Sequence, residues 1–366
     1  MKIAITTATD RGYLPAAACQ LKSMADHLSA PDAAVLFLVC CDVSDQDVKD
    51  AEAFFETHNI NVKVIVPDFV DNRVKTINDK WPRAAYLRLY FDAIFGKEYD
   101  RLIYFDADTR VRSSLDRLLD CDLRGNPVGA VHDFIYYVTG NIRRRRKDLH
   151  LSDDAPYLQS GVMVFDWHQT IDKDYLGKAR QVLQDNPEGC QEAPDQDALN
   201  VAFENLWTPL DPRWNLHETY LGFGGKLTPH LEHYTSTKPW SINRPEAWRN
   251  AAEWYTTQLK ASAWPDFIPV QSAKDKMMSK LRFAKFRYTP KIRNGLAKGA
   301  PFVLDMLKTP RQRSDNEELP WAPRNKKDVE DMAAALIEEA DAKRELIRPP
   351  ESVLDGFDSG RLIGIN

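Results

Sequence analysis

Short apolar runs alternate with helix-like segments through the first hundred residues, and this alternation restricts the fold more than any other feature of the chain. The runs are rich in β-branched and aromatic residues, as buried strands are. Between them, Ser44 followed three residues later by Asp47 is typical of a helix start. The pattern predicts an α/β fold, a mostly parallel sheet with helices on both faces. The expected strands are 2–7, 34–41, 61–66 and 101–106, and the expected helices are 16–28, 44–57 and 83–95.

The length of 366 residues indicates one large domain with extensions, or two domains. Two more strands, at 127–132 and 161–165, extend the predicted sheet. Further along, the composition becomes basic and rich in Met and Phe, and an apolar stripe with helical spacing runs through 326–347. We therefore expect a principal domain at 1–245, a basic and aromatic helical segment at 246–313, and a linker with an amphipathic helix at 314–366. The extension beyond the principal domain is expected to be mostly helical.

Two carboxylates, Asp106 and Asp108, follow the apolar strand that ends at Phe105. In open α/β sheets ligands bind at the carboxyl ends of the strands, where both side chains could reach one hard divalent cation bound to a diphosphate. Asp-x-Asp also occurs simply as a turn cap, and a phosphatase-type motif has the same spacing. Phosphatases of that type, however, place Thr or Val where this chain has Arg110, and their Asp pair follows the first strand. A metal site is the reading we favour.

A second group of polar side chains lies in the segment from His233 to Trp240. An imidazole suits a borderline cation such as Mn²⁺, and Lys238 supplies a positive charge for phosphate oxygens. A single His or Lys is most often structural or solvated. Both within one short segment beside Pro239-Trp240 form a more specific pattern.

Seven short stretches follow one another along residues 2–245 in the order of a known set of motifs: Ala8–Tyr13, Tyr86-Leu87-Arg88, Phe105–Asp108, Gly129–Asp133, Tyr157–Val162, Asp195–Asn200 and His233–Trp240. They resemble the motifs of glycosyltransferase family 8, the retaining GT-A enzymes that include glycogenin and bacterial lipopolysaccharide α-galactosyl- and α-glucosyltransferases. Two positions depart from the family: Gln159 stands where the family usually has Asn, and the spacing from His233 to Lys238 is one residue shorter than usual, without the family's Gly.

The resemblance implies a GT-A, Rossmann-like mixed sheet and a metal-dependent enzyme that transfers a hexose, galactose or glucose, from a UDP-sugar with retention of configuration. It implies Mn²⁺ or Mg²⁺ at Asp106, Asp108 and His233. By the same resemblance the donor-binding residues are Asp10 and Tyr13 at the uracil, Arg88 and Lys238 at the diphosphate, and Asp133 and Gln159 at the sugar.

The resemblance also implies that Gln196, at the centre of the Asp195-Gln196-Asp197 motif, lies on the β-face of the sugar. Retaining glycosidases use a carboxylate pair, but an amide is a poor nucleophile. We therefore expect front-face attack assisted by the leaving phosphate, with Gln196 stabilising the cationic sugar and Asp195 orienting it. Two alternatives remain open: an inverting transferase with Asp195 or Asp197 as the base, and a scaffold protein that binds nucleotide sugars without transferring them.

Two basic stretches stand out in a chain whose net charge is −5. The run Arg143–Lys147 predicts a solvated loop or, alternatively, a clamp for an acidic glycan. Residues 274–313 hold 12 Lys/Arg against 2 Asp/Glu, interleaved with large apolar side chains. For 274–300 we expect peripheral contact with an anionic membrane, the alternative being a surface helix packed on the main domain. No nucleic-acid-binding module accompanies this charge.

The expected location is the cytoplasm, with contact to the inner face of the membrane. The chain opens directly into a strand-like stretch, without an apolar export signal. Its five cysteines are odd in number and form no CxxC pair, which indicates reduced thiols. The expected acceptor is a glycan or glycolipid, such as a lipid-linked surface polysaccharide or the lipopolysaccharide core.

Overall fold

The computed structural model describes residues 1–133, 136, 141–216, 228–235, 237–279 and 281, with isolated positions at 334 and 338. Apart from positions 334 and 338, the expected linker and amphipathic helix at 314–366 lie outside the described residues, as does the whole of the basic segment beyond 281. The domain boundaries proposed from the sequence therefore stay predictions.

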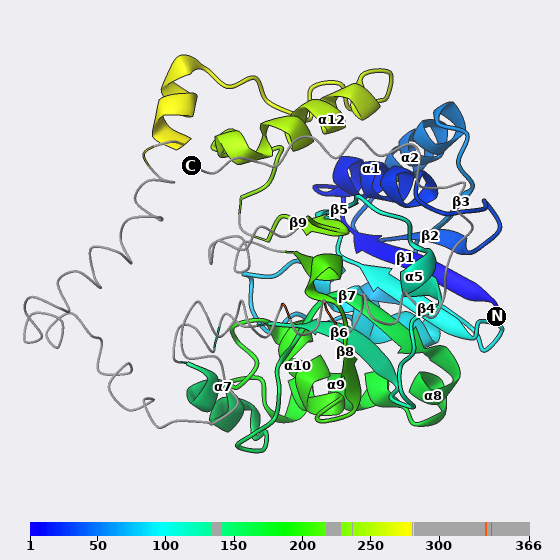
Figure 1. Cartoon of the computed structure of the whole chain (residues 1–366), viewed down its shortest axis with the longest axis vertical. Helices are drawn as coiled ribbons and strands as arrows, with labels where there is room; N and C mark the ends of the chain where they lie inside the picture. The colour runs from blue at the N-terminus through cyan, green and yellow to red at the C-terminus, as the bar shows by residue number, and fades with distance from the viewer. Residues whose placement is uncertain are drawn as a thin grey trace, which may run out of the picture.

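A seven-stranded sheet forms the centre of the molecule, in the order β3-β2-β1-β4-β7-β6-β8 (Figure 1). All neighbouring strands are parallel except at β7, which runs antiparallel to both β4 and β6. The predicted mixed, mostly parallel sheet is confirmed, and the short β8 was not expected. The strands are β1 Ile3–Thr9, β2 Val35–Cys40, β3 Val62–Ile65, β4 Arg101–Phe105, β6 Val128–His132, β7 Leu158–Asp166 and β8 Trp207–Pro209.

Helices cover both faces of this sheet. Helices α1 and α2 lie on one face with α12 beside α1, and α8, α9 and α10 lie on the other (Figure 1). The helix predicted at 83–95 is a single α-turn followed by a 3₁₀-helix. The α-helices are α1 Leu14–Ala25, α2 Asp45–Thr57, α3 Val70–Arg73, α4 Arg83–Tyr86, α5 Asp116–Leu119, α7 Ile142–Leu149, α8 Trp167–Asp172, α9 Tyr175–Asp185, α10 Pro194–Ala202 and α12 Arg249–Leu259. The 3₁₀-helices are η1 Leu87–Ala93, η2 Pro212–Asn215 and η3 Glu246–Trp248.

Local sequence explains the start of α2. The Ser44 hydroxyl accepts a hydrogen bond from the Asp47 backbone N–H at 3.2 Å, and the Asp47 carboxylate accepts one from the Ser44 N–H at 2.8 Å. This reciprocal pair is a capping box, and it satisfies two backbone donors that the first helical turn leaves unpaired. The helix start predicted from Ser44 and Asp47 is confirmed.

The basic run Arg143–Lys147 is not the solvated loop that its composition predicts. It forms most of α7, and the side chains of Arg145 and Arg146 are 1% and 2% exposed. Arg145 forms an ion pair with Asp197, and Arg146 donates to the carbonyl of Ala155 at 2.8 Å. The sequence prediction was wrong because buried charges of this kind are stabilised by partners distant in the chain.

The described part of the chain contains no helix both long enough and apolar enough to span a bilayer.

Near the middle of the sheet, β7 departs from regular pairing with β6: Ala130 pairs with Met163, but the next residue, Val131, pairs with Gln159. The intervening residues of β7, including Gly161, are thereby left out of the β6–β7 ladder. Irregularities of this kind often re-aim side chains next to functional sites.

Candidate metal centre

A second, two-stranded sheet brings His233 beside the two carboxylates that follow β4. Strand β5 (Thr109–Val111) begins directly after Asp108 and pairs antiparallel with β9 (Leu231–His233), so that Thr109 lies opposite His233. The Tyr234 backbone N–H also donates to the Asp108 carbonyl at 3.0 Å. This pairing joins parts of the chain that are at least 120 residues apart.

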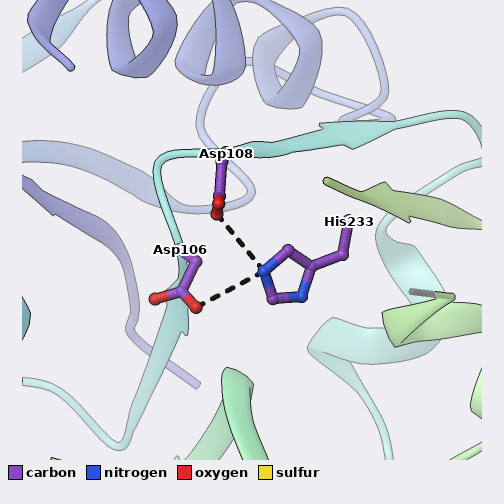
Figure 2. Close-up of side chains that lie close together, drawn as sticks. All are labelled: Asp106, Asp108 and His233. Carbon is purple, nitrogen blue, oxygen red and sulfur yellow. Dashed lines mark ion pairs between the residues drawn. The ribbon is translucent and has the colours of Figure 1, made fainter. Parts of the chain in front are cut away.

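One ring nitrogen of His233 faces both carboxylates (Figure 2). Its Nε2 lies 3.5 Å from Asp106 Oδ2 and 3.2 Å from Asp108 Oδ1. One ligand atom from each residue lies within 4.8 Å of the other two. Two ligands that bind one cation at right angles, each at about 2.1 Å, are about 3 Å apart. The spacing and the mixed carboxylate–imidazole donor set therefore fit a single divalent cation.

Gly161 of β7 forms the floor of this centre. A Cβ atom at that position would lie 2.4 Å from His233 Cε1 and 2.8 Å from Asp106 Oδ2. Its carbonyl accepts a hydrogen bond from the Asp106 N–H at 2.8 Å. Only a residue without a side chain allows the imidazole and the carboxylate to approach the strand this closely.

Lys238 forms an ion pair with Asp108 and donates to the Thr235 carbonyl at 3.1 Å. Burial alone would raise the pKa of the Asp108 carboxyl, but the charge of Lys238 holds it below its usual range. Burial lowers the pKa of the Lys238 ammonium, but the charge of Asp108 raises it by more, so the pKa of Lys238 lies above its usual value. Both groups therefore stay charged at neutral pH, and Lys238 is held at the centre despite its shorter spacing from His233.

Arg88 connects the metal centre to Asp195. Its guanidinium donates to Asp106 Oδ1 at 2.5 Å and to the Ser160 carbonyl at 3.1 Å, and its Nε lies 3.2 Å from Asp195 Oδ2. The Tyr104 hydroxyl also donates to Asp106 Oδ1, at 2.6 Å. Asp106 thus has one oxygen fixed by two donors, while the other faces His233.

Gln196, Asp133 and Asp195 lie together at the start of α10 and the end of β6. The Gln196 amide oxygen accepts from the Ser160 backbone N–H at 3.0 Å, and its amide nitrogen donates to Asp133 at 3.1 Å. The amide is therefore held in one orientation. Burial raises the pKa of Asp195, while the charge of Arg88 opposes that shift.

Asp10 and Tyr13, the residues implied at the uracil, lie in the turn after β1. The Asp10 carboxylate accepts from the Tyr13 backbone N–H at 3.1 Å. The Tyr13 ring meets Trp240 edge-to-face with centroids 5.7 Å apart, and the Lys238 ammonium lies 6.0 Å from the same ring. The first and last motifs of the resemblance therefore lie side by side.

The side chain of Gln159 is hydrogen-bonded to two neighbours of the centre. Its amide oxygen accepts from the Gly161 backbone N–H at 2.6 Å and from the side-chain amide of Asn215. Asn215, at the end of η2, in turn contacts His233. Asn215, Tyr104 and Ser160 were all missed at the level of the sequence. None belongs to a pattern of charged residues, and although Ser160 lies within the stretch Tyr157–Val162, only the structure shows its contacts with Arg88 and Gln196.

Known proteins resemble part of this chain. General stress protein A of Bacillus subtilis (strain 168) is 28% identical over 196 residues, which cover 49% of this chain and 66% of that protein. Lipopolysaccharide 1,2-glucosyltransferase of Escherichia coli (strain K12) is 28% identical over 201 residues, 52% of this chain and 57% of that protein. Each match spans less than two thirds of the relative.

A solved structure, that of the galactosyltransferase LgtC in complex with donor and acceptor sugar analogues, superposes with a TM-score of 0.61 at 20% identity, over 72% of this chain and 99% of that one. This similarity confirms the predicted GT-A fold. The sequence pattern of glycosyl transferase family 8 matches residues 4–244, which is most of the described part of the chain. The chain therefore belongs to glycosyltransferase family 8.

Proposed function

We propose that this glycosyltransferase moves a hexose, galactose or glucose, from a UDP-sugar to a glycan acceptor, with retention of configuration and dependence on Mn²⁺ or Mg²⁺. The observation that carries the proposal is the convergence of Asp106, Asp108 and His233 within 4.8 Å, with the Lys238 ammonium beside them. The relative named as a lipopolysaccharide 1,2-glucosyltransferase supports a hexose donor and a lipopolysaccharide-type acceptor.

Breaking the bond between the sugar and the diphosphate leaves negative charge on the UDP oxygens. A divalent cation held by the two Asp and the His would neutralise that charge when bound. Lys238 adds a second positive charge at the same place. Arg88 binds Asp106 and Asp195 simultaneously, so we assign it to positioning these carboxylates as well as to the electrostatics of the donor site.

For the transfer itself we propose front-face attack. The bond from the anomeric carbon to the β-phosphate oxygen breaks, the acceptor oxygen bonds to the same face, and the acceptor proton passes to the leaving phosphate. The orientation of Gln196 supports a stabilising role, because its oxygen already accepts the Ser160 N–H and its nitrogen is bound to Asp133. We propose that the donor sugar is oriented by Asp133, Asp195 and Gln159. The uracil of the donor is bound by Asp10 and Tyr13.

An inverting reaction needs a free carboxylate on the acceptor side. Asp197 is fully buried and paired with Arg145, and Asp195 is paired with Arg88. Neither arrangement favours a base that must receive a proton from an acceptor hydroxyl. Determining the anomeric configuration of the product by NMR distinguishes the two reactions; a product of inverted configuration would overturn the proposal.

The first experiment is UDP release from a panel of UDP-sugars with Mn²⁺, Mg²⁺ or a chelator. We expect release with UDP-galactose or UDP-glucose that is abolished by the chelator. Nucleotide binding without any release, with every donor and acceptor glycan tried, would instead support a scaffold protein.

Gln196→Ala tests the role of the amide. A stabilising contact predicts a fall in kcat of about 10²- to 10³-fold. A loss beyond about 10⁴-fold, with the fold intact by circular dichroism, would point to a covalent nucleophile instead.

We also propose that the segment beginning at 274 contacts an anionic membrane surface, so that the enzyme works at the inner face of the membrane on a lipid-linked acceptor. Among the described residues, the side chains of Met277 and Leu281 are 57% and 56% exposed, next to the exposed Lys274 and Lys276. Exposed apolar groups interleaved with cations suit the headgroup region of a bilayer.

Co-sedimentation of the full chain with vesicles tests this contact. We expect binding to phosphatidylglycerol vesicles and weak binding to phosphatidylcholine vesicles. Met277→Asp with Leu281→Asp should abolish it, whereas Val270→Asp, at a side chain 92% exposed outside the segment, should not. Equal binding by all three proteins would contradict the proposal.

A further inference from the structure

Four groups form a continuous hydrogen-bonded chain that ends at the metal centre. The Gly161 backbone N–H donates to Gln159 Oε1 at 2.6 Å, and the Asn215 side-chain amide donates to the same oxygen. Asn215 Oδ1 lies 2.7 Å from His233 Nδ1. The side chains of Gln159, Asn215 and His233 belong to residues only 8%, 0% and 2% exposed, so water does not compete for these bonds.

The direction of every bond in this chain follows from its first member. A backbone N–H can only donate, so Gln159 presents its oxygen. That oxygen accepts, so Asn215 must turn its NH₂ group towards Gln159 and its oxygen towards His233. The oxygen of Asn215 accepts a hydrogen bond from the Nδ1–H of His233, which leaves Nε2 as the ring nitrogen that offers a lone pair towards Asp106 and Asp108.

We propose that Gln159 and Asn215 are positioning residues for the metal centre: together they fix the orientation of the His233 ring and the nitrogen through which it binds the cation. Partners of this kind behind a metal-binding His commonly affect metal affinity by 10- to 100-fold. The inference rests on the proposed metal site but not on the choice of donor or acceptor sugar.

The length of the Gln159 side chain is part of what makes this hydrogen-bonded chain continuous. Asn at that position would be one methylene shorter and would withdraw its oxygen from Asn215 by about 1.5 Å. Gln159→Asn, which introduces the residue usual in the family, is therefore expected to loosen the chain and weaken metal binding. Gln159→Glu keeps an oxygen that can accept from both the Gly161 N–H and the Asn215 amide, so we expect this variant to retain metal binding.

Isothermal titration of the purified full-length protein with Mn²⁺, with UDP present, measures the effect directly. We expect Mn²⁺ affinity to fall at least tenfold in Gln159→Leu and Asn215→Leu, and not to fall in Gln159→Glu, whose added charge also attracts the cation. Asn200→Leu is the matched control: Asn200 is also a buried amide, bonded to the Leu158 backbone, and its loss should lower the melting temperature without changing Mn²⁺ affinity.

A double-mutant cycle tests the direction of the chain. Asn215→Asp still accepts from His233 but cannot donate to Gln159, so two acceptor oxygens would face each other. The added charge of Asn215→Asp attracts the cation whichever residue stands at position 159. The quantity to compare is therefore the change in Mn²⁺ affinity that Asn215→Asp causes in each of the two proteins. Asn215→Asp should be at least tenfold more favourable to Mn²⁺ binding in a Gln159→Leu protein than in the wild type.

The outcomes separate the two proposals. If the wild-type protein does not bind Mn²⁺ or Mg²⁺, the proposed metal centre fails. If the wild type binds, but Gln159→Leu and Asn215→Leu bind equally well, the metal centre stands and the positioning role is overturned. Zero coupling in the cycle would overturn the fixed direction.

Discussion

At the scale of single residues, Asp108 has two partners that depend on its charge. One oxygen faces His233, and the other is paired with Lys238. Asp108→Asn removes one anionic ligand and leaves the Lys238 charge unpaired. We expect a fall in Mn²⁺-dependent turnover of at least about 10²-fold, measured as UDP release over a range of Mn²⁺ concentrations.

Asp120→Asn, at an exposed position after α5, is the control for that substitution and should keep the activity of the wild type. Unchanged turnover in Asp108→Asn would exclude Asp108 from the centre.

Gly161 supports a second prediction at this scale. The Cβ of Gly161→Ala would displace His233 or Asp106, so we expect Mn²⁺ affinity to fall by more than about tenfold and the free energy of unfolding to fall by about 1–3 kcal/mol. Gly129→Ala provides the comparison, because its Cβ would meet Leu123 at 2.8 Å and Leu210 at 3.0 Å. It should lose stability but retain Mn²⁺ affinity. Equal Mn²⁺ affinity in the two variants would contradict the close packing inferred at Gly161.

The charged residues of the centre could be predicted from the sequence because charged side chains directly after an apolar strand, or close together in one short segment, form a recognisable pattern. Asp106 and Asp108 follow a strand, and His233 and Lys238 share a segment. Asn215 could not be found in this way, since a neutral amide after a 3₁₀-helix carries no pattern. Its assignment needs the fold, which brings it against His233.

At the scale of elements, α7 is held to the start of α10 by one buried ion pair. Arg145 and Asp197 are 1% and 0% exposed, and Tyr157 also donates to Asp197. Arg145→Leu leaves the carboxylate buried without its charge partner. We expect the free energy of unfolding to fall by about 3–5 kcal/mol, measured by urea denaturation followed by circular dichroism.

The double variant Arg145→Leu/Asp197→Asn should recover part of that loss, because it removes the uncompensated charge. A double variant less stable than Arg145→Leu alone would show that the cost does not come from the lone carboxylate.

Long apolar strands were predictable because their residues are buried on both faces: all seven residues of β1 are buried. The shorter elements that build the centre were not. β5 and β9 have three residues each and form only because they pair with each other. The loop predicted for Arg143–Lys147 was wrong because Asp197, the buried partner of Arg145, lies about 50 residues further along the chain. A local sequence pattern does not show such a distant partner.

At the scale of the whole molecule, stability should depend on pH through His132 in β6. Burial lowers the pKa of its imidazole from 6.5 to about 4. Between these values the unfolded chain binds a proton that the folded chain does not, so stability is complete above pH 6.5 and is lost as the pH falls towards 4. The loss is at most about 3 kcal/mol.

His132→Phe removes this proton and should reduce the difference in unfolding free energy between pH 7 and pH 4.5 by about 2 kcal/mol relative to the wild type. Other titrating groups are common to both proteins and cancel in the comparison. Urea denaturation at the two pH values measures it, and equal acid sensitivity of the two proteins would exclude His132 as its source.

The antiparallel β7 between β4 and β6 has a consequence for synthesis on the ribosome. The first four strands of the sheet are complete at Phe105, but β4 acquires its second neighbour only with Leu158–Asp166. Until those residues emerge, the nascent chain presents a bare strand edge to its surroundings, and such edges pair readily with other chains. Fragments that stop before Asp166 should therefore aggregate, whereas those that extend beyond the last strand should not.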